Sequence, residues 1–295
     1  MTELILRESV KKTVDRTILI TGSARSGTTI MGKLIHSMKQ VEYMFEPPFL
    51  VSLFSKIETL DENNWKFFFS SYLYEDFFLN SIAGRNLNFN LNDDSSILNA
   101  KSELEIENRL KSKYRKESLE ILANDFRPAI KIPSLVPYIG RFSSYFPKIK
   151  IIYLRRNPVD SVNSLIEKDW FSDNSLNNSN REWPVFEYKK WKIPYWVQKE
   201  DFEHWIKLND YDRCAYYFIK MNEDIELNNV IKVDYDELLQ YPHKIVDKLS
   251  NELELKPGIK THELIQNVKK TEKDRDLGII DRMSPFFKEI LLKYK

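Results

Sequence analysis

The chain has 295 residues, and its 45 basic and 44 acidic side chains leave a net charge of +1. This balance excludes a global field that would draw the protein onto nucleic acid or an anionic membrane. A single cysteine, Cys214, excludes an internal disulfide framework, and we expect it to be a small buried residue in a helix. Because the sequence shows neither the apolar segment of a signal peptide nor the roughly 18 apolar residues of a membrane span, we expect a cytoplasmic protein.

Apolar runs rich in β-branched residues alternate along the chain with segments in which apolar residues recur at helical spacing. This alternation predicts an α/β fold, with a parallel sheet flanked by helices on both faces. Strands are predicted at 17–21, 42–46, 127–132, 149–154 and 229–235. Helices are predicted behind Gly27, at 50–82, at 102–125, between Pro133 and Phe146, and at 158–169, 201–223, 242–253, 260–271 and 284–293. Residues 170–200 are rich in aromatic residues, show no clean period and are predicted to be an insertion.

The loop after the first strand has the glycine spacing of a phosphate-binding loop, except that Thr28 stands where lysine is expected. Glycines let backbone N–H groups approach an anion, and the following helix adds the positive end of its dipole. The alternative is a tight turn capped by Ser26 or Thr28. A P-loop lysine and magnesium neutralise the several charges of a phosphoryl group, whereas Arg25 suits a sulfuryl group, which carries one negative charge fewer. The residues predicted to hold the anion are Gly22, Ser23, Ala24, Arg25, Ser26, Gly27, Thr28 and Thr29.

A second candidate anion site follows the strand at 149–154. The strand is followed by Arg156, Asn157 is a good N-cap, and Pro158 fits the first position of a helix. Helical spacing lets Ser164 face the same side as the end of the strand. Taken alone, the pattern is also typical of an ordinary capped helix start.

These two motifs resemble those of the sulfotransferases that use 3′-phosphoadenosine 5′-phosphosulfate. Arg25-Ser26-Gly27-Thr28-Thr29 is similar to the loop that holds the 5′-phosphosulfate in that family, and Arg156 and Ser164 match the pair that holds the 3′-phosphate. The resemblance covers roughly residues 17–255 and implies one sulfotransferase domain over 1–295, with 170–200 on the acceptor side. It also implies that 3′,5′-ADP is the product and that no metal is needed. A bidentate guanidinium at Arg156 would favour this donor over ATP, which lacks a 3′-phosphate.

Transfer to a hydroxyl needs a group that accepts its proton. Cytosolic small-molecule sulfotransferases have a histidine two residues after a strand-end lysine, whereas this chain keeps Lys131 but has Pro133 at that position. The stretch 41–50 instead resembles the Glu-Pro element of Golgi-type carbohydrate sulfotransferases and several bacterial ones, which implies that Glu46 is the base. Lys131 would then point at the sulfuryl group or the bridging oxygen. The alternatives are a solvated Glu46 and a strand-end Lys131 in water.

The acceptor is the least determined part of this hypothesis. The Glu-Pro resemblance favours a saccharide hydroxyl, with a lipid, a tyrosine or a small alcohol as alternatives. Aromatic and basic residues of the insertion could contact an acidic glycan, or the aromatic residues could pack the insertion onto the body. We assign no role to residues 268–284. The rival functions are a P-loop small-molecule kinase and a non-catalytic nucleotide-binding module. The insertion residues concerned are Trp183, Lys189, Lys190, Trp191, Lys192, Tyr195 and Trp196.

Overall fold

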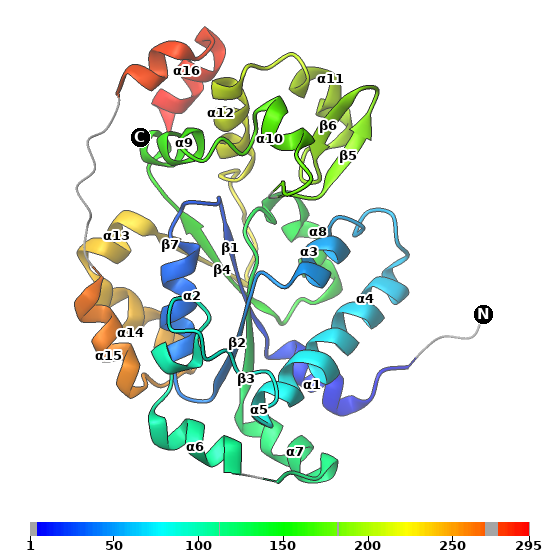
Figure 1. The fold of residues 1–295 in the computed structure, drawn as a ribbon, viewed down its shortest axis with the longest axis vertical. Coiled ribbons are helices and arrows are strands. Elements are labelled where there is room, and N and C mark those ends of the chain that lie inside the picture. Colours follow the sequence, from blue (N-terminus) through cyan, green and yellow to red (C-terminus); the bar gives the residue numbers. More distant parts are fainter. Residues whose placement is uncertain (1–4, 112, 182, 269–276, 295) are drawn as a thin grey trace.

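The computed structural model describes residues 5–111, 113–181, 183–268 and 277–294. Within these ranges five strands form one parallel sheet in the order β2-β3-β1-β4-β7, with β1 in the centre (Figure 1). The strands are β1 Ile18–Gly22, β2 Val41–Phe45, β3 Arg127–Lys131, β4 Lys150–Arg155 and β7 Val230–Asp234. Each predicted strand is confirmed with both ends within one residue of the observed bounds.

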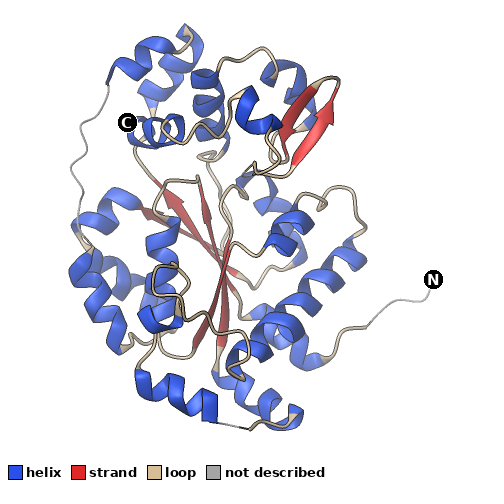
Figure 2. Cartoon of the chain, in the orientation of Figure 1, coloured by secondary structure: helices blue, strands red, loops and turns tan. Residues whose placement is uncertain are grey.

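Successive side chains of the central strand enter opposite cores, as the period of a strand requires. Ile18 and Ile20 pack into one core, and Leu19 packs into the other. Both faces of the sheet are therefore covered by helices, which confirms the predicted α/β fold (Figure 2). The first core includes α2 Thr28–Ser37, α13 Tyr235–Gln240, α14 Pro242–Glu252 and α15 Ile259–Asn267. The second includes α1 Glu8–Asp15, α3 Pro48–Phe54, α4 Glu62–Ser71, α5 Leu79–Ile82, α8 Ile139–Tyr145, α9 Pro158–Ile166 and α12 Asp210–Lys220.

The predicted insertion folds into a short helix and a hairpin beside α12, in the upper part of Figure 1. It comprises α10 Asp173–Asn177 and the antiparallel strands β5 Val185–Tyr188 and β6 Trp191–Pro194, and α11 Phe202–Trp205 follows it. Trp183, Tyr195 and Trp196 are buried in the second core. These aromatic residues therefore pack the insertion onto the body of the protein.

Three helices predicted as continuous are divided in the structure. The segment 50–82 contains α3, α4, a π-helical turn at Tyr72–Phe78 and α5, and 102–125 contains α6 Glu103–Lys111 and α7 Lys116–Leu122. In 201–223, α12 begins after Asn209, whose side chain accepts a hydrogen bond from the Asp212 N–H at 2.9 Å. New N-caps such as Asn209 start separate helices within segments of continuous amphipathic pattern.

The C-terminal elements are only partly described. The helix predicted at 260–271 ends at Asn267, and residues 269–276, which belong to the unassigned 268–284 segment, lie outside the described residues. Beyond them come a 3₁₀ turn at Leu277–Arg282 and α16 Pro285–Lys293. Of the helices that the structure describes, none has the length and apolar character needed to cross a bilayer. The single domain and the cytoplasmic location stay predictions.

Cys214 lies on α12 with 3% of its surface exposed, which confirms the predicted buried position. Burial raises the pKa of its thiol well above the usual value, so the sulfur stays protonated.

Candidate active site

The glycine-containing loop connects β1 directly to α2. The N-cap of α2 is Gly27, at φ +87°, and no side chain caps this helix. The Ser26 hydroxyl instead donates to the Ser23 carbonyl at 2.6 Å, so the loop is not the serine- or threonine-capped turn that was the alternative. Because the first N–H groups of a helix have no intrahelical partner, an uncapped N-terminus leaves them available to an anion.

Both glycines of the loop occupy positions that a larger residue could not fill. A Cβ on Gly22, at φ +148°, would lie 2.4 Å from the Leu154 carbonyl oxygen. A Cβ on Gly27 would lie 2.0 Å from the Tyr235 ring, and its positive φ is also unfavourable for other residues. The backbone of the loop is therefore held close to β4 and to the start of α13.

The two predicted anion motifs are in direct contact. Arg25, at φ +69°, donates from Nε to the Ser164 hydroxyl at 2.9 Å. Its carbonyl accepts a hydrogen bond from Arg156 Nη1 at 2.7 Å. The Arg156 guanidinium also lies 5.1 Å from the centre of the Tyr235 ring, and its buried Nε has no partner among the described residues. These contacts join the loop after β1, the end of β4 and α9 into one hydrogen-bonded group that includes an unused donor.

Three contributors to this group were missed in the sequence. Tyr217 on α12 accepts a hydrogen bond from the Ala24 N–H at 2.7 Å, and its hydroxyl lies 2.6 Å from that of Ser134. Burial raises the pKa of Tyr217 to about 12. Tyr235, at the start of α13, contributes the aromatic ring next to the Arg156 guanidinium. No local pattern marked Tyr217 or Ser134, because both contacts join distant segments.

Glu46 and Lys131 meet at the ends of the neighbouring strands β2 and β3. Glu46 follows β2 with φ +42°, and its N–H donates to the Lys131 carbonyl at 2.8 Å. The Lys131 ammonium forms an ion pair with the Glu46 carboxylate and lies 3.4 Å from the Thr29 hydroxyl of the loop. It also lies 4.2 Å from the centre of the Phe45 ring. One ammonium group therefore joins the candidate base to the loop.

The burial of this pair rules out a solvated strand-end lysine. The Lys131 side chain is 3% exposed, whereas that of Glu46 is 29% exposed. Burial lowers the pKa of Lys131, and the adjacent carboxylate opposes that shift. Glu46 is thus the more exposed member of the pair.

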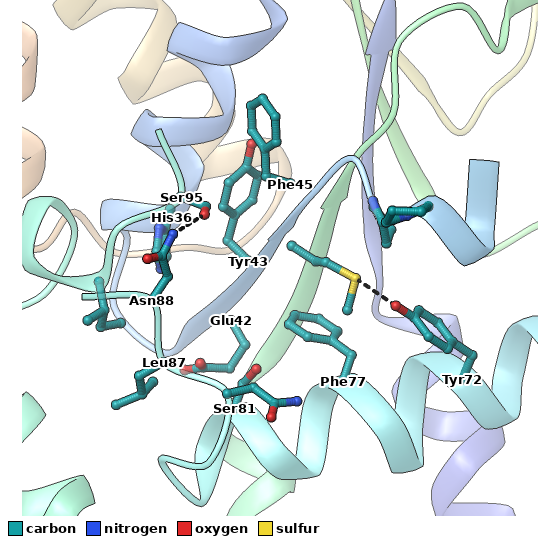
Figure 3. A pocket seen from close by; sticks show the side chains of 15 residues that line it. His36, Glu42, Tyr43, Phe45, Tyr72, Phe77, Ser81, Leu87, Asn88 and Ser95 are labelled. Carbon is teal, nitrogen blue, oxygen red and sulfur yellow. Dashed lines mark hydrogen bonds between the residues drawn. The ribbon is translucent and has the colours of Figure 1, made fainter. Parts of the chain in front are cut away.

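Two cavities flank the segment that carries Glu46. One, of about 210 Å³, lies between Glu46, Ile132 and the insertion residues Trp183 and Tyr195. The other, of about 290 Å³, lies along the edge strand β2 and is lined by Tyr43, Phe45 and Asn88 among others (Figure 3). Pro48 lines both cavities, and only the first is lined by the Glu46 side chain.

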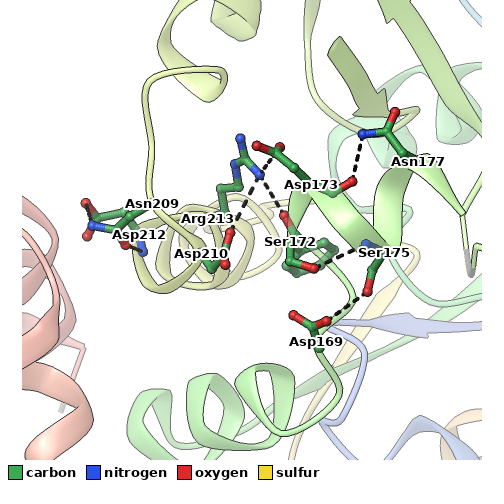
Figure 4. Close-up of polar contacts among 10 residues, drawn as sticks. Asp169, Ser172, Asp173, Ser175, Asn177, Asn209, Asp210, Asp212 and Arg213 are labelled. Carbon is green, nitrogen blue, oxygen red and sulfur yellow. Dashed lines mark hydrogen bonds and ion pairs between the residues drawn. The ribbon is translucent and has the colours of Figure 1, made fainter.

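A buried arginine connects the start of the insertion to α12. Arg213 Nη1 donates to the Phe171 carbonyl at 2.9 Å and pairs with Asp173 at 2.8 Å and Asp210 at 3.7 Å (Figure 4). Arg213 lies one helical turn before Tyr217, so both side chains project from the same part of α12. The same helix therefore contacts the loop and the start of the insertion.

The fold and the loop together define a P-loop-type α/β protein. A family model described as the sulfotransferase family matches residues 17–257. The chain belongs to this family and is a sulfotransferase that depends on 3′-phosphoadenosine 5′-phosphosulfate, which family membership implies as the sulfuryl donor. This membership decides against the kinase and the non-catalytic module.

One solved sulfotransferase structure shares the fold. Sulfotransferase STF9 from Mycobacterium avium is similar, with a TM-score of 0.50 and 12% identity, covering 97% of this chain and 78% of that chain. The sulfotransferase domain of the Synechococcus olefin synthase matches with a TM-score of 0.44 and 14% identity, covering 92% of this chain and 82% of that chain. Comparison with curated proteins finds no significant match.

Proposed function

We propose that this sulfotransferase acts on a hydroxyl of a saccharide, with Glu46 as the general base. The observation that carries the proposal is the position of the Lys131 ammonium, which contacts both the Glu46 carboxylate and the Thr29 hydroxyl of the loop. A base for this reaction has to lie next to the group that holds the sulfuryl donor, because proton removal accompanies bond formation to sulfur. Glu46 meets that requirement, because only the Lys131 side chain lies between it and Thr29 of the loop.

The described residues fit the two ends of the donor. Backbone N–H groups between Gly22 and Thr29 would hold the 5′-phosphosulfate, and Arg25 would stabilise charge on the leaving phosphate. The unpartnered Nε of Arg156 supports a role in holding the 3′-phosphate. The Ser164 hydroxyl already accepts a hydrogen bond from Arg25, which leaves its own O–H to donate to the same phosphate. When bound, the donor supplies the activated sulfuryl group.

In this mechanism the proton of the acceptor and the negative charge of the leaving phosphate go to different groups of the protein. Glu46 would accept the proton of the acceptor hydroxyl as the oxygen bonds to sulfur, and the bond from sulfur to the bridging oxygen breaks. Arg25 and the loop would hold the negative charge that remains on the phosphate. Lys131 would compensate charge beside the reacting oxygen while it holds the carboxylate in place. These side chains would perform the transfer without a metal ion.

Replacement of Glu46 by glutamine tests the base directly. Transfer of radiolabelled sulfate from the donor to a panel of glycans should fall by about 10²- to 10⁴-fold in kcat. Affinity for 3′,5′-ADP should be retained, because glutamine keeps the size of the side chain. Glu58→Gln, at an exposed glutamate, is the matched control. An unchanged kcat in Glu46→Gln would remove Glu46 from the mechanism.

A further inference from the structure

The cavity beside Glu46 is small and largely apolar. Its volume is about 210 Å³, below the ~300–1,000 Å³ typical of pockets for drug-sized ligands. Val51, Ile132 and Pro133 supply apolar surface, and Glu46 is the only charged residue among the described residues that line it. The space therefore suits one ring of an acceptor rather than an extended chain.

Two residues that line this cavity carry hydrogen-bond donors that are unused. The indole N–H of Trp183 and the hydroxyl of Tyr195 are buried and have no partner among the described residues. The two residues are 7% and 1% exposed and come from opposite sides of the hairpin. Because an unpaired buried donor costs free energy, a bound molecule gains affinity if a small shift of these two side chains brings the donors to its oxygen atoms.

The lysines of the insertion do not serve this cavity. Lys189 pairs with Glu203, and Lys192 pairs with Glu187 at 2.9 Å. Lys190 lies 5.2 Å from the centre of the Trp191 ring. None of the three lines the cavity. An anionic acceptor would thus meet the Glu46 carboxylate without a compensating cation from the hairpin, which removes the support for an acidic glycan.

We propose that this cavity binds one uncharged, polyhydroxylated ring, such as a neutral hexose, and that Trp183 and Tyr195 determine this specificity. The inference rests on the proposed function, since it places the reacting hydroxyl at Glu46. A sugar ring offers an apolar face to the aromatic wall and further oxygens to the two unused donors. A simple phenol has a single oxygen, which must lie at Glu46, so it leaves both donors unpaired.

The test compares four acceptors: methyl hexopyranosides, the corresponding methyl glycosides of uronic acids, 4-methylphenol and 1-octanol. The expected result is sulfate transfer to at least one hexoside, with kcat/KM about tenfold or more above that of the other three classes. Trp183→Phe and Tyr195→Phe each remove one donor and keep an aromatic ring. Each should raise KM for the hexoside about 3- to 10-fold while 3′,5′-ADP affinity stays unchanged.

Two control variants separate this role from general packing. Trp205 also has a buried, unpartnered indole N–H but does not line the cavity, so Trp205→Phe should leave KM for the hexoside unchanged. Tyr188→Phe, on the outer part of the hairpin, should also leave it unchanged. Equal increases in KM for all four variants would overturn the specificity role.

The remaining outcomes separate the inference from the proposed function. Transfer only to the uronide, the phenol or the alkyl alcohol would overturn the neutral-sugar assignment and leave sulfuryl transfer intact. Binding of 3′,5′-ADP with no transfer to any of the four would also overturn it. Failure to bind 3′,5′-ADP at all would instead overturn the proposed donor site.

Discussion

Replacement of Arg156 by alanine should reduce the affinity for 3′,5′-ADP more than the affinity for 5′-AMP. Arg156 donates to the Arg25 carbonyl at 2.7 Å, and loss of this bond would loosen the loop for any nucleotide. A hydrogen bond of this kind contributes about 0.5–1.5 kcal/mol, so affinity for 5′-AMP should fall roughly 2- to 10-fold. A hydrogen bond to a charged phosphate contributes about 1.5–3 kcal/mol. The affinity for 3′,5′-ADP should therefore fall by a further ~10- to 100-fold.

Titration calorimetry with the two nucleotides measures this difference, and the ratio of their losses isolates the 3′-phosphate contact. Arg155→Ala is the matched control, because Arg155 is the adjacent residue at the end of β4. Arg155→Ala should reduce the affinity for both nucleotides only slightly and by the same factor. If Arg156→Ala weakens 3′,5′-ADP and 5′-AMP by the same factor, Arg156 does not bind the 3′-phosphate and the assigned orientation of the donor is wrong.

Three further substitutions test the loop and the buried charge. Gly27→Ala places a Cβ 2.0 Å from Tyr235 and should lower the free energy of unfolding by at least ~1–2 kcal/mol, read as a lower melting temperature; an unchanged stability would contradict the described loop. Tyr217→Phe leaves the buried Ala24 N–H unpaired and should cost about 1–3 kcal/mol, divided between stability and 3′,5′-ADP affinity; no change in either would exclude this support. Burial lowers the pKa of Lys101 to about 8 from 10.5, so the unfolded chain holds a proton that the folded chain releases between these values. The free energy of unfolding should therefore rise with pH across this window, by up to roughly 3 kcal/mol, and denaturant titrations of Lys101→Met should lack that rise.

Local sequence signals predicted the strands and the loop well. Each strand is a buried apolar run bounded by turn residues, so neighbouring residues alone determine its position. The loop followed from the positions of Gly22 and Gly27. The starts of α4 and α12 could also have been predicted from the sequence, because Asp61 and Asn209 are good N-caps. In the structure the Asp61 side chain accepts a hydrogen bond from the Asn64 N–H at 3.0 Å. These helix starts were missed because amphipathic spacing continues past them.

Contacts across the sheet were beyond local reasoning. The Lys131 and Glu46 pair depends on β2 lying next to β3, with Phe45 opposite Lys131, and strand order is not written in either segment. Tyr217 reaches Ala24 across 193 positions of sequence. Such contacts arise from the packing of whole elements and carry no spacing pattern that a single sequence reveals. The candidate site was thus predictable as separate motifs, and the structure supplies what joins them.

The contacts made by α12 bear on how such an enzyme could change its substrate. Arg213 fastens the start of the insertion, and Tyr217, one turn later, supports the loop from the same helix. Residues between 174 and 197 could therefore be exchanged as a module, provided that the Arg213 contacts at Phe171 and Asp173 and the buried aromatic side chains are kept. A graft of this kind would alter which acceptor is recognised while the nucleotide half of the protein keeps its support. If the insertion sets the acceptor, as proposed, then acceptor recognition and donor support lie on separate segments that one helix joins.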